Sequence, residues 1–117
     1  MTQKVDNHWY PVAMCSGVEA PRETLLLGRK ISLGKTEGCF WVRDDAGKEM
    51  PAIEKYGHLW TSPGKPNREL FVIPEADEPG RRLVDCGSVR VKCSPLRAVE
   101  NFLDIAHFPF VHTDILG

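Results

Sequence analysis

The sequence has no long apolar run and little net charge. Its 15 lysines and arginines nearly balance 16 aspartates and glutamates, which leaves a formal charge of −1. This balance gives no reason to expect nucleic acid or an anionic membrane as a partner. No apolar stretch approaches the roughly 20 residues that a membrane-spanning helix needs. The composition therefore predicts a protein that binds neither nucleic acid nor membrane.

The sequence also lacks a secretory signal and closely spaced cysteines. Residues 1–7 are mostly polar and show no apolar signal-peptide core. The four cysteines, Cys15, Cys39, Cys86 and Cys93, are scattered along the chain. Without a secretory signal, such cysteines are expected to be reduced thiols. The sequence therefore favours a cytoplasmic location.

What the sequence does contain is the composition of one modest globular domain, 42% hydrophobic over 117 residues. Several stretches are rich in β-branched and aromatic residues and are separated by Gly/Pro turns. These strand patterns lie at 9–14, 25–33, 39–43, 50–60, 70–73 and 82–91. Gly28 is expected to form a turn or bulge, and Gly47 to give 44–48 a turn with positive φ. The expected fold is mainly β, an antiparallel sandwich or partly open barrel of six or more short strands.

A helical pattern follows the last predicted strand. Ser94 can serve as an N-cap, and Pro95 as the first helical residue. Apolar residues then recur at helical spacing: Leu96, Val99, Leu103 and Ala106. The chain is therefore predicted to have two parts, a β-sandwich domain at 1–93 and a C-terminal helix and tail at 94–117.

The helical segment carries the polar motif Asn-x2-Asp-x2-His-x4-His, formed by Asn101, Asp104, His107 and His112. Neutral imidazole is the commonest protein metal ligand, and two close together suit iron(II). Asp104 and His107 are three residues apart and would share a helix face. Pro109 disfavours an unbroken helix, so a kink there could bring both imidazoles to one point. The alternative is an amphipathic helix with incidental polar residues.

With Glu100 in front, this motif resembles that of the oxygenase α-subunits of Rieske non-haem iron ring-hydroxylating oxygenases. The two-residue spacing between Asn101 and Asp104 is most similar to the demethylase and monooxygenase branch. The resemblance implies His107 and His112 as iron ligands. It also implies Asp104 as the acid that bridges a ligand histidine toward the cluster of a neighbouring subunit, and Asn101 as a residue near the iron.

Parts of the β region resemble the same family. Residues 9–13, Trp-Tyr-Pro-Val-Ala, are similar to the family's opening segment. Residues 54–60 are similar to its Glu-x-Tyr-Gly-x-x-Trp strand. Within that strand, His58 is expected to be a satisfied histidine rather than a ligand, and His8 is expected to be exposed. The tryptophans expected in the sandwich core are Trp9, Trp41 and Trp60.

Two departures from the family pattern limit what the resemblance implies. A Rieske cluster needs Cys-x-His and Cys-x2-His, and no histidine lies two or three residues after any cysteine here. A short connection at 44–50 replaces the family's cluster-binding insert, so no [2Fe–2S] cluster is expected. The family's third iron ligand is an aspartate on a later helix, and Asp114 is too close to His112 to be that residue. The mononuclear Fe(II) site is therefore expected to be incomplete.

The implied activity is that of an aromatic-ring-hydroxylating mono- or dioxygenase or demethylase, although the chain alone is not expected to turn over. Three interpretations stay open. The chain is a minimal cluster-free oxygenase-like protein, one piece of a split oxygenase, or a non-catalytic binding or regulatory module.

The segment 101–116 is more apolar than one helix face requires. Its apolar residues are Phe102, Leu103, Ile105, Phe108, Phe110, Val111, Ile115 and Leu116. Large exposed apolar patches usually mark interfaces. We therefore expect this segment to contact a second copy, with a two-fold contact as the default form, or a partner oxygenase chain.

Overall fold

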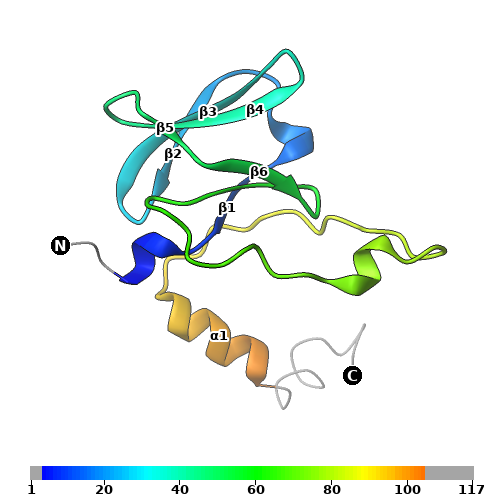
Figure 1. Cartoon of the computed structure of the whole chain (residues 1–117). Coiled ribbons are helices and arrows are strands. Elements are labelled where there is room, and N and C mark those ends of the chain that lie inside the picture. Colours follow the sequence, from blue (N-terminus) through cyan, green and yellow to red (C-terminus); the bar gives the residue numbers. More distant parts are fainter. Residues whose placement is uncertain (1–3, 105–117) are drawn as a thin grey trace. The chain divides into compact units, whose positions relative to one another are not determined.

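The described chain consists of short antiparallel strands followed by one α-helix (Figure 1). The structure is a computed structural model that describes residues 4–104. Its strands are β1 (Tyr10–Met14), β2 (Arg22–Leu26), β3 (Arg29–Thr36), β4 (Cys39–Asp44), β5 (Glu49–Met50), β6 (Ala52–Lys55) and β7 (His58–Thr61). The helical elements are the 3₁₀ turns η1 (Lys4–Asn7), η2 (Cys15–Gly17) and η3 (Pro74–Asp77), and the helix α1 (Pro95–Leu103). The predicted mainly β fold with a C-terminal helix is confirmed.

The strands form two antiparallel sheets, ordered β1-β7-β6 and β2-β3-β4-β5. Neither sheet closes into a barrel within residues 4–104. The chain passes from the second sheet to the first at Pro51, which has no backbone N–H for a sheet ladder. The Thr61 hydroxyl donates to the Pro51 carbonyl oxygen at 2.6 Å, which ties this crossing to β7.

The hydrophobic core is formed by buried residues from both sheets. On β3, Ile31 and Leu33 are almost completely buried, and Leu33 pairs in register with the buried Val42 of β4. From the other sheet, Leu59 of β7 is fully buried in the same cluster. The alternation of buried and partly buried residues at 31–33 fits the period-two pattern of a strand, and Gly34, which the Trp41 ring covers, is buried as well. It confirms the strand that the sequence predicted there.

Three hairpins close through two-residue turns in which both central residues have positive φ. The turns are Leu27-Gly28, Glu37-Gly38 and Tyr56-Gly57. Positive φ at both central positions defines the type I′ turn, whose twist matches that of paired strands. The expected turn at Gly28 and the positive φ expected at Gly47 are both confirmed.

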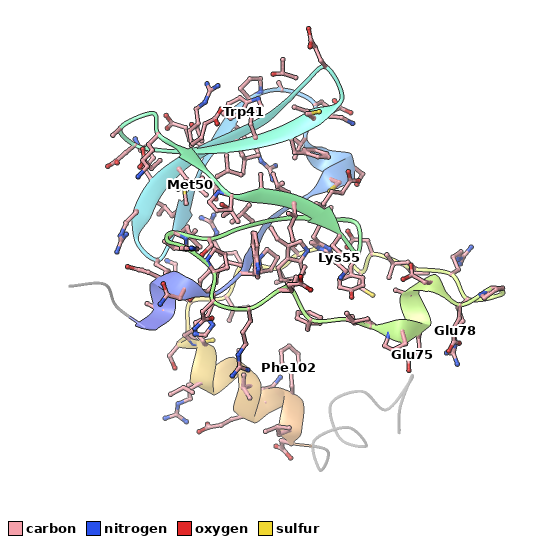
Figure 2. The ribbon with its side chains drawn as sticks, in the orientation of Figure 1. Trp41, Met50, Lys55, Glu75, Glu78 and Phe102 are labelled. Atoms are coloured by element: carbon pink, nitrogen blue, oxygen red, sulfur yellow. The ribbon has the colours of Figure 1, made fainter. Side chains whose placement is uncertain are left out.

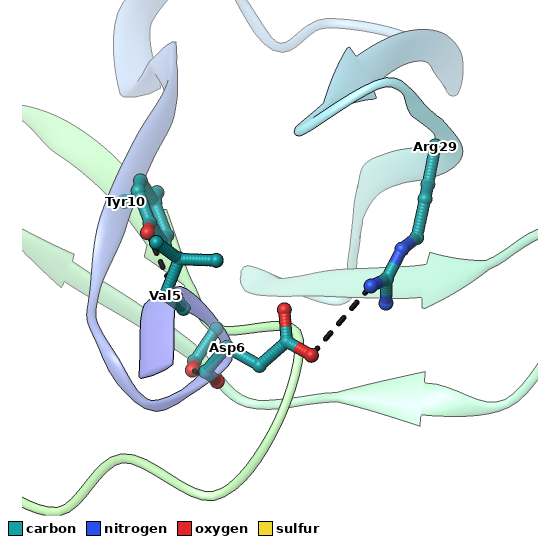
Figure 3. Close-up of polar contacts among 5 residues, drawn as sticks. Val5, Asp6, Tyr10 and Arg29 are labelled. Atoms are coloured by element: carbon teal, nitrogen blue, oxygen red, sulfur yellow. Dashed lines mark hydrogen bonds and ion pairs between the residues drawn. The ribbon is translucent and has the colours of Figure 1, made fainter. Parts of the chain in front are cut away.

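The 3₁₀ turn η1 contacts the strand region through its backbone and through the buried carboxylate of Asp6 (Figure 3). The Asp6 carbonyl oxygen accepts from the Gly64 N–H at 2.8 Å, and a Cβ at Gly64 would lie 2.8 Å from that oxygen. The Asp6 carboxylate lies 3.5 Å from the Arg29 guanidinium. The Tyr10 hydroxyl donates to the Val5 carbonyl oxygen at 2.7 Å. These contacts hold η1 against the segment that follows β7 and against Arg29 at the start of β3.

Two of the predicted strands are wrong. Residues 70–73 and 82–91 form no strand in the structure. Their side chains include exposed apolar residues such as Val72, Leu83 and Val89. The sequence pattern describes side chains suited to a pleated surface, but a strand also needs a neighbour for its backbone hydrogen bonds. Neither segment has such a neighbour among the described residues.

The single strand predicted at 50–60 is also wrong, because this stretch contains the end of β5, then β6 and β7. Pro51 separates β5 from β6, and the Tyr56-Gly57 turn separates β6 from β7. The chain therefore does continue in strands after the 44–48 turn, as predicted, but β5 belongs to one sheet and β6 and β7 to the other.

The chain divides into two compact units, Met1–Asp85 and Cys86–Gly117. In the second unit, α1 begins as predicted. The Ser94 hydroxyl oxygen accepts from the Arg97 N–H at 3.3 Å, and proline occupies the first turn. The helix ends at Leu103, and no residue of α1 is buried. The division that the sequence predicted between residues 93 and 94 stays a prediction.

No helix within residues 4–104 is long and apolar enough to cross a membrane.

Candidate metal centre and its surroundings

The structure places two of the four motif residues at the C-terminal end of α1. Asn101 lies in the last turn, and Asp104 is the C-cap residue. The Asp104 N–H donates to the carbonyl oxygens of Glu100 at 3.1 Å and Asn101 at 3.3 Å. Both side chains are on exposed residues. His107 and His112 lie outside the described residues, so the expected iron ligands and their approach stay predictions.

The described donor atoms do not by themselves form a metal site. Among residues 4–104, no group of three His, Cys, Asp or Glu side chains is arranged to hold a metal ion. Two imidazoles, from His107 and His112, are chemically suited to Fe(II), and the usual third ligand is a carboxylate. Asp104, the C-cap residue of α1, is the described carboxylate nearest to these histidines in sequence. The donor chemistry therefore fits a mononuclear Fe(II) whose ligand set needs completion.

The β4–β5 connection does not offer ligands for an iron–sulfur cluster. One Asp44 carboxylate oxygen accepts from the N–H groups of Ala46 at 3.0 Å and Lys48 at 2.9 Å, which makes this a short, self-contained turn. Residues 44–50 contain neither cysteine nor histidine. All four cysteines of the chain are free, and they lie on separate segments. These residues do not fit a Rieske cluster, so no electron-transfer step through one is assigned to this chain.

Cys15, which follows β1, has a perturbed thiol. Partial burial raises the pKa of the Cys15 thiol, and the negative charge and hydrogen bond of the Glu54 carboxylate raise it further. The positive charge of Lys35 opposes this shift. Because the thiolate is the reactive form, Cys15 is a weak nucleophile near neutral pH. The site thus has no activated cysteine at this position.

Tyr56 and His58 form polar contacts that sequence reasoning did not predict. The Tyr56 hydroxyl donates to the Phe71 carbonyl oxygen at 2.9 Å and accepts from the Ile73 N–H at 2.7 Å. His58 Nδ1 lies 3.0 Å from the Tyr56 carbonyl oxygen, and its Nε2 lies 4.0 Å from Asp85. His58 is therefore a satisfied histidine, as expected. The only signal for this arrangement was the Tyr-Gly pair inside the family-like segment 54–60.

The tryptophans have different surroundings. Trp60 is buried, and its indole N–H donates to the Lys55 carbonyl oxygen at 2.8 Å. Trp41, labelled in Figure 2, is half-buried and lies over Gly34, where a Cβ would come within 2.5 Å of its ring. The Arg43 guanidinium lies 4.6 Å from the Trp41 ring centroid. Trp41 therefore packs on the backbone of β3 and is not part of the core cluster.

Comparison with known proteins gives one clear similarity. The chain is 43% identical over 116 residues to the probable methylxanthine N7-demethylase NdmC of Pseudomonas sp. (strain TJI-51). The match covers 97% of this chain and 41% of that relative, so the chain spans about two fifths of the relative's length. No family model matches the chain. The similarity supports the resemblance to Rieske-type oxygenases, and to their demethylases in particular.

Proposed function

We propose that this chain forms part of a Rieske-type oxygenase of the N-demethylase branch. In this proposal it contributes a cluster-free β frame and two iron-ligating histidines. One observation carries the proposal, the 43% identity with a probable N7-demethylase along 97% of the chain. The Asn-x2-Asp-x2-His-x4-His spacing supports it on chemical grounds, because it provides the imidazoles that iron(II) chemistry requires.

The proposed substrate is a flat N-methylated heterocycle such as a methylxanthine, by analogy with the relative. In the net reaction, the N–CH₃ compound, O₂, two electrons and two protons give the N–H compound, formaldehyde and water. Bound Fe(II) would supply the activation of O₂. The electrons would come from a separate reductase, since this chain has no Cys-x-His motif for a cluster of its own.

Each motif residue has a proposed role. His107 and His112 would hold the iron. Asp104 would hydrogen-bond to a ligand histidine on the side where electrons arrive, and Asn101 would lie near the iron. The exposed position of Asp104 at the end of α1 is compatible with an electron donor on another chain.

The missing carboxylate and substrate pocket are proposed to come from further sequence, either a partner oxygenase chain or a second copy meeting at 101–116. The described start of that segment supports a contact there, because Phe102 (Figure 2) and Leu103 are both about three-quarters exposed, at 76% and 75%. The cytoplasm is the proposed compartment, with the four cysteines as free thiols.

A non-catalytic binding module is the second candidate. The observation that favours it is the apolar side of α1, where Leu96, Val99 and Leu103 recur at helical spacing and remain exposed. Such a helix could engage an oxygenase subunit without contributing to its chemistry.

A complementation experiment tests the proposal and separates the two candidates. The chain is co-expressed with the portion of NdmC that it does not match, and the purified mixture receives a methylxanthine and a reductase. We expect formaldehyde release that requires both chains and is lost in His107→Ala or His112→Ala. The control His8→Ala, which changes an exposed histidine outside the motif, should retain it.

Two outcomes would contradict the catalytic role. One is formaldehyde release that is unaffected by either motif substitution. The other is a stable complex that releases no formaldehyde, which would favour the binding module.

A further inference from the structure

Two segments that follow β7 return to the β6–β7 turn within the Met1–Asp85 unit. At residues 71–73, the chain is bound by the Tyr56 hydroxyl through the Phe71 carbonyl and the Ile73 N–H. Farther on, Leu83 is the neighbour that a Cβ at Gly57 would meet, at 3.9 Å. The turn therefore binds the segment that precedes the loop 74–82 and lies near Leu83, which follows it.

The Tyr56 side chain replaces the neighbouring strand that residues 71–73 lack. One hydroxyl serves both a carbonyl oxygen and an N–H two residues apart, which is the pair of groups that an antiparallel neighbour would satisfy. The rings of Tyr56 and Phe71 stack with centroids 5.8 Å apart, and Trp60 meets Phe71 edge-on at 5.7 Å. Polar and aromatic contacts therefore fix the first end of the loop together.

Tyr56 holds this position in a backbone conformation that tyrosine disfavours. Its φ is +56°, and the first central position of a type I′ turn prefers asparagine, aspartate or glycine. Leu27 and Glu37 occupy the same position in the other two hairpins, but neither side chain has a polar contact of this kind among the described residues. Backbone strain of this type persists where surrounding contacts determine it.

His58 lies between the turn and Asp85, which follows the second end of the loop. The Tyr56 carbonyl oxygen can only accept, so His58 Nδ1 carries the hydrogen in their 3.0 Å contact. This leaves Nε2 facing the Asp85 carboxylate at 4.0 Å, which it attracts when the ring is protonated. Asp85 is the last residue of the Met1–Asp85 unit. In the protonated form, one imidazole therefore links the turn to the point at which the chain leaves that unit.

The loop closed in this way has features of its own. The loop contains η3, in which Glu75 lies, and Glu78 follows it; both are labelled in Figure 2. A hollow of about 410 Å³ is lined in part by Arg81, Arg82 and Leu83. Compact surface loops whose ends are held together are frequently functional. Here the ends are held by side chains of the turn.

We propose that Tyr56 and His58 form a clamp that holds the two ends of the 74–82 loop together and fixes where the chain leaves the Met1–Asp85 unit. Both are positioning residues. The clamp stands on the contacts above.

Amide hydrogen exchange tests the clamp without reference to iron or turnover. In Tyr56→Phe the ring remains but the hydroxyl is lost, so the Ile73 amide should exchange about two- to tenfold faster. The β3 amides, which report global opening, should not change. Tyr10→Phe is the matched control, because it removes a hydroxyl bonded to the Val5 carbonyl elsewhere in the unit and should leave Ile73 unaffected.

A second pair of variants separates the two functions of His58. His58→Asn keeps a donor near Nδ1, whereas His58→Gln keeps one near Nε2. We expect trypsin to cleave after Arg82 about two- to tenfold faster in the asparagine variant than in the glutamine variant, because only the latter retains a contact with Asp85.

The clamp is overturned if Tyr56→Phe leaves the Ile73 amide unchanged, or if Ile73 and β3 accelerate equally. It is also overturned if both His58 variants are cleaved at the same rate. Failure of formaldehyde release in the complementation experiment, with these exchange effects present, would contradict the proposed function and leave the clamp intact.

Discussion

Residues 29–36 and residues 88–92 have the same alternating sequence character but different structures. In β3, Ile31 and Leu33 are 2% and 0% exposed, and the strand lies between β2 and β4. In 88–92, Val89 and Val91 alternate with Arg90 and Lys92 in the same way, yet they are 87% and 65% exposed and form no strand. The difference is the presence of neighbouring strands, which provide both the backbone hydrogen bonds and the surface for burial.

The intermediate case is the segment 70–73. It also has strand-like sequence and no neighbouring strand, but the Tyr56 hydroxyl satisfies the backbone groups of Phe71 and Ile73. Leu70 is buried there, whereas Val72 is exposed. A single side chain can therefore fix an extended segment without adding it to a sheet.

Truncating one apolar side chain in each segment should give the largest difference in stability between β3 and residues 88–92. Leu33→Ala removes a fully buried side chain from the paired region and should lower the free energy of unfolding by about 2–5 kcal/mol. Val89→Ala removes an exposed side chain and should change it by no more than about 0.5 kcal/mol. Urea denaturation followed by tryptophan fluorescence measures both. An equal loss of unfolding free energy in both variants would contradict the comparison, because it would mean that Val89 is buried in solution.

Gly34 tests the outer face of the same strand. A Cβ at Gly34 would lie 2.5 Å from the Trp41 ring, so Gly34→Ala should displace the indole and cost about 1–3 kcal/mol. Gly17→Ala is the control, because nothing lies within 4 Å of a Cβ there. Adding Trp41→Leu to Gly34→Ala should recover part of the loss. No recovery in the double variant would contradict the steric explanation.

The start of α1 depends on local sequence rather than on a neighbouring strand. Ser94→Ala removes the oxygen that accepts from the Arg97 N–H and should destabilise the helix by about 1 kcal/mol. Far-ultraviolet circular dichroism should show less helix. Ser88→Ala, in the unpaired segment, should leave the helical signal unchanged. An equal loss in both variants would argue against capping by Ser94.

Cysteine reactivity should show the smallest effect. Because burial and the Glu54 carboxylate raise the pKa of Cys15, less thiolate is present at any given pH. Its alkylation should be slow at neutral pH and should rise only at a higher pH than that of an unperturbed thiol. Glu54→Gln should move that rise to lower pH, since it removes one of the raising charges. Mass spectrometry after timed alkylation gives the rates, and an unmoved profile would exclude Glu54 as a cause.

The sequence predicted those elements whose signals are local. Ser94 and Pro95 set the beginning of α1, and glycine identified the turns at Gly28 and Gly47. The alternation in 25–33 and 39–43 led to the correct strands because each hairpin brings its partner within two residues. In these cases, propensity and pairing agree.

The sequence did not predict features that depend on distant residues. Nothing local shows that Pro51 divides the stretch 50–60 between two sheets, or that Trp41 faces Gly34 and not the core. The Tyr56 contact reaches residues 15 and 17 positions away, beyond any sequence periodicity. For the candidate site, the helical spacing was expected to continue through Ala106 and to place Asp104 on a helix face. This was wrong for Asp104, because α1 ends at Leu103 and Asp104 is its C-cap. The roles of His107 and His112 stay predictions.

Anaerobic Fe(II) titration by calorimetry tests the central claim most directly, since that claim assigns metal binding to the motif histidines. The chain has four histidines, which allows a balanced comparison of His107→Ala/His112→Ala with His8→Ala/His58→Gln. Each form is titrated in complex with the portion of NdmC that the chain does not match, because the proposal takes the third ligand from further sequence. We predict that the complexes of the wild type and of the His8/His58 variant bind about one Fe(II) with similar affinity, and that the complex of the motif variant binds none. Equal binding by the complexes of both double variants, or no binding by the wild-type complex, would contradict the account.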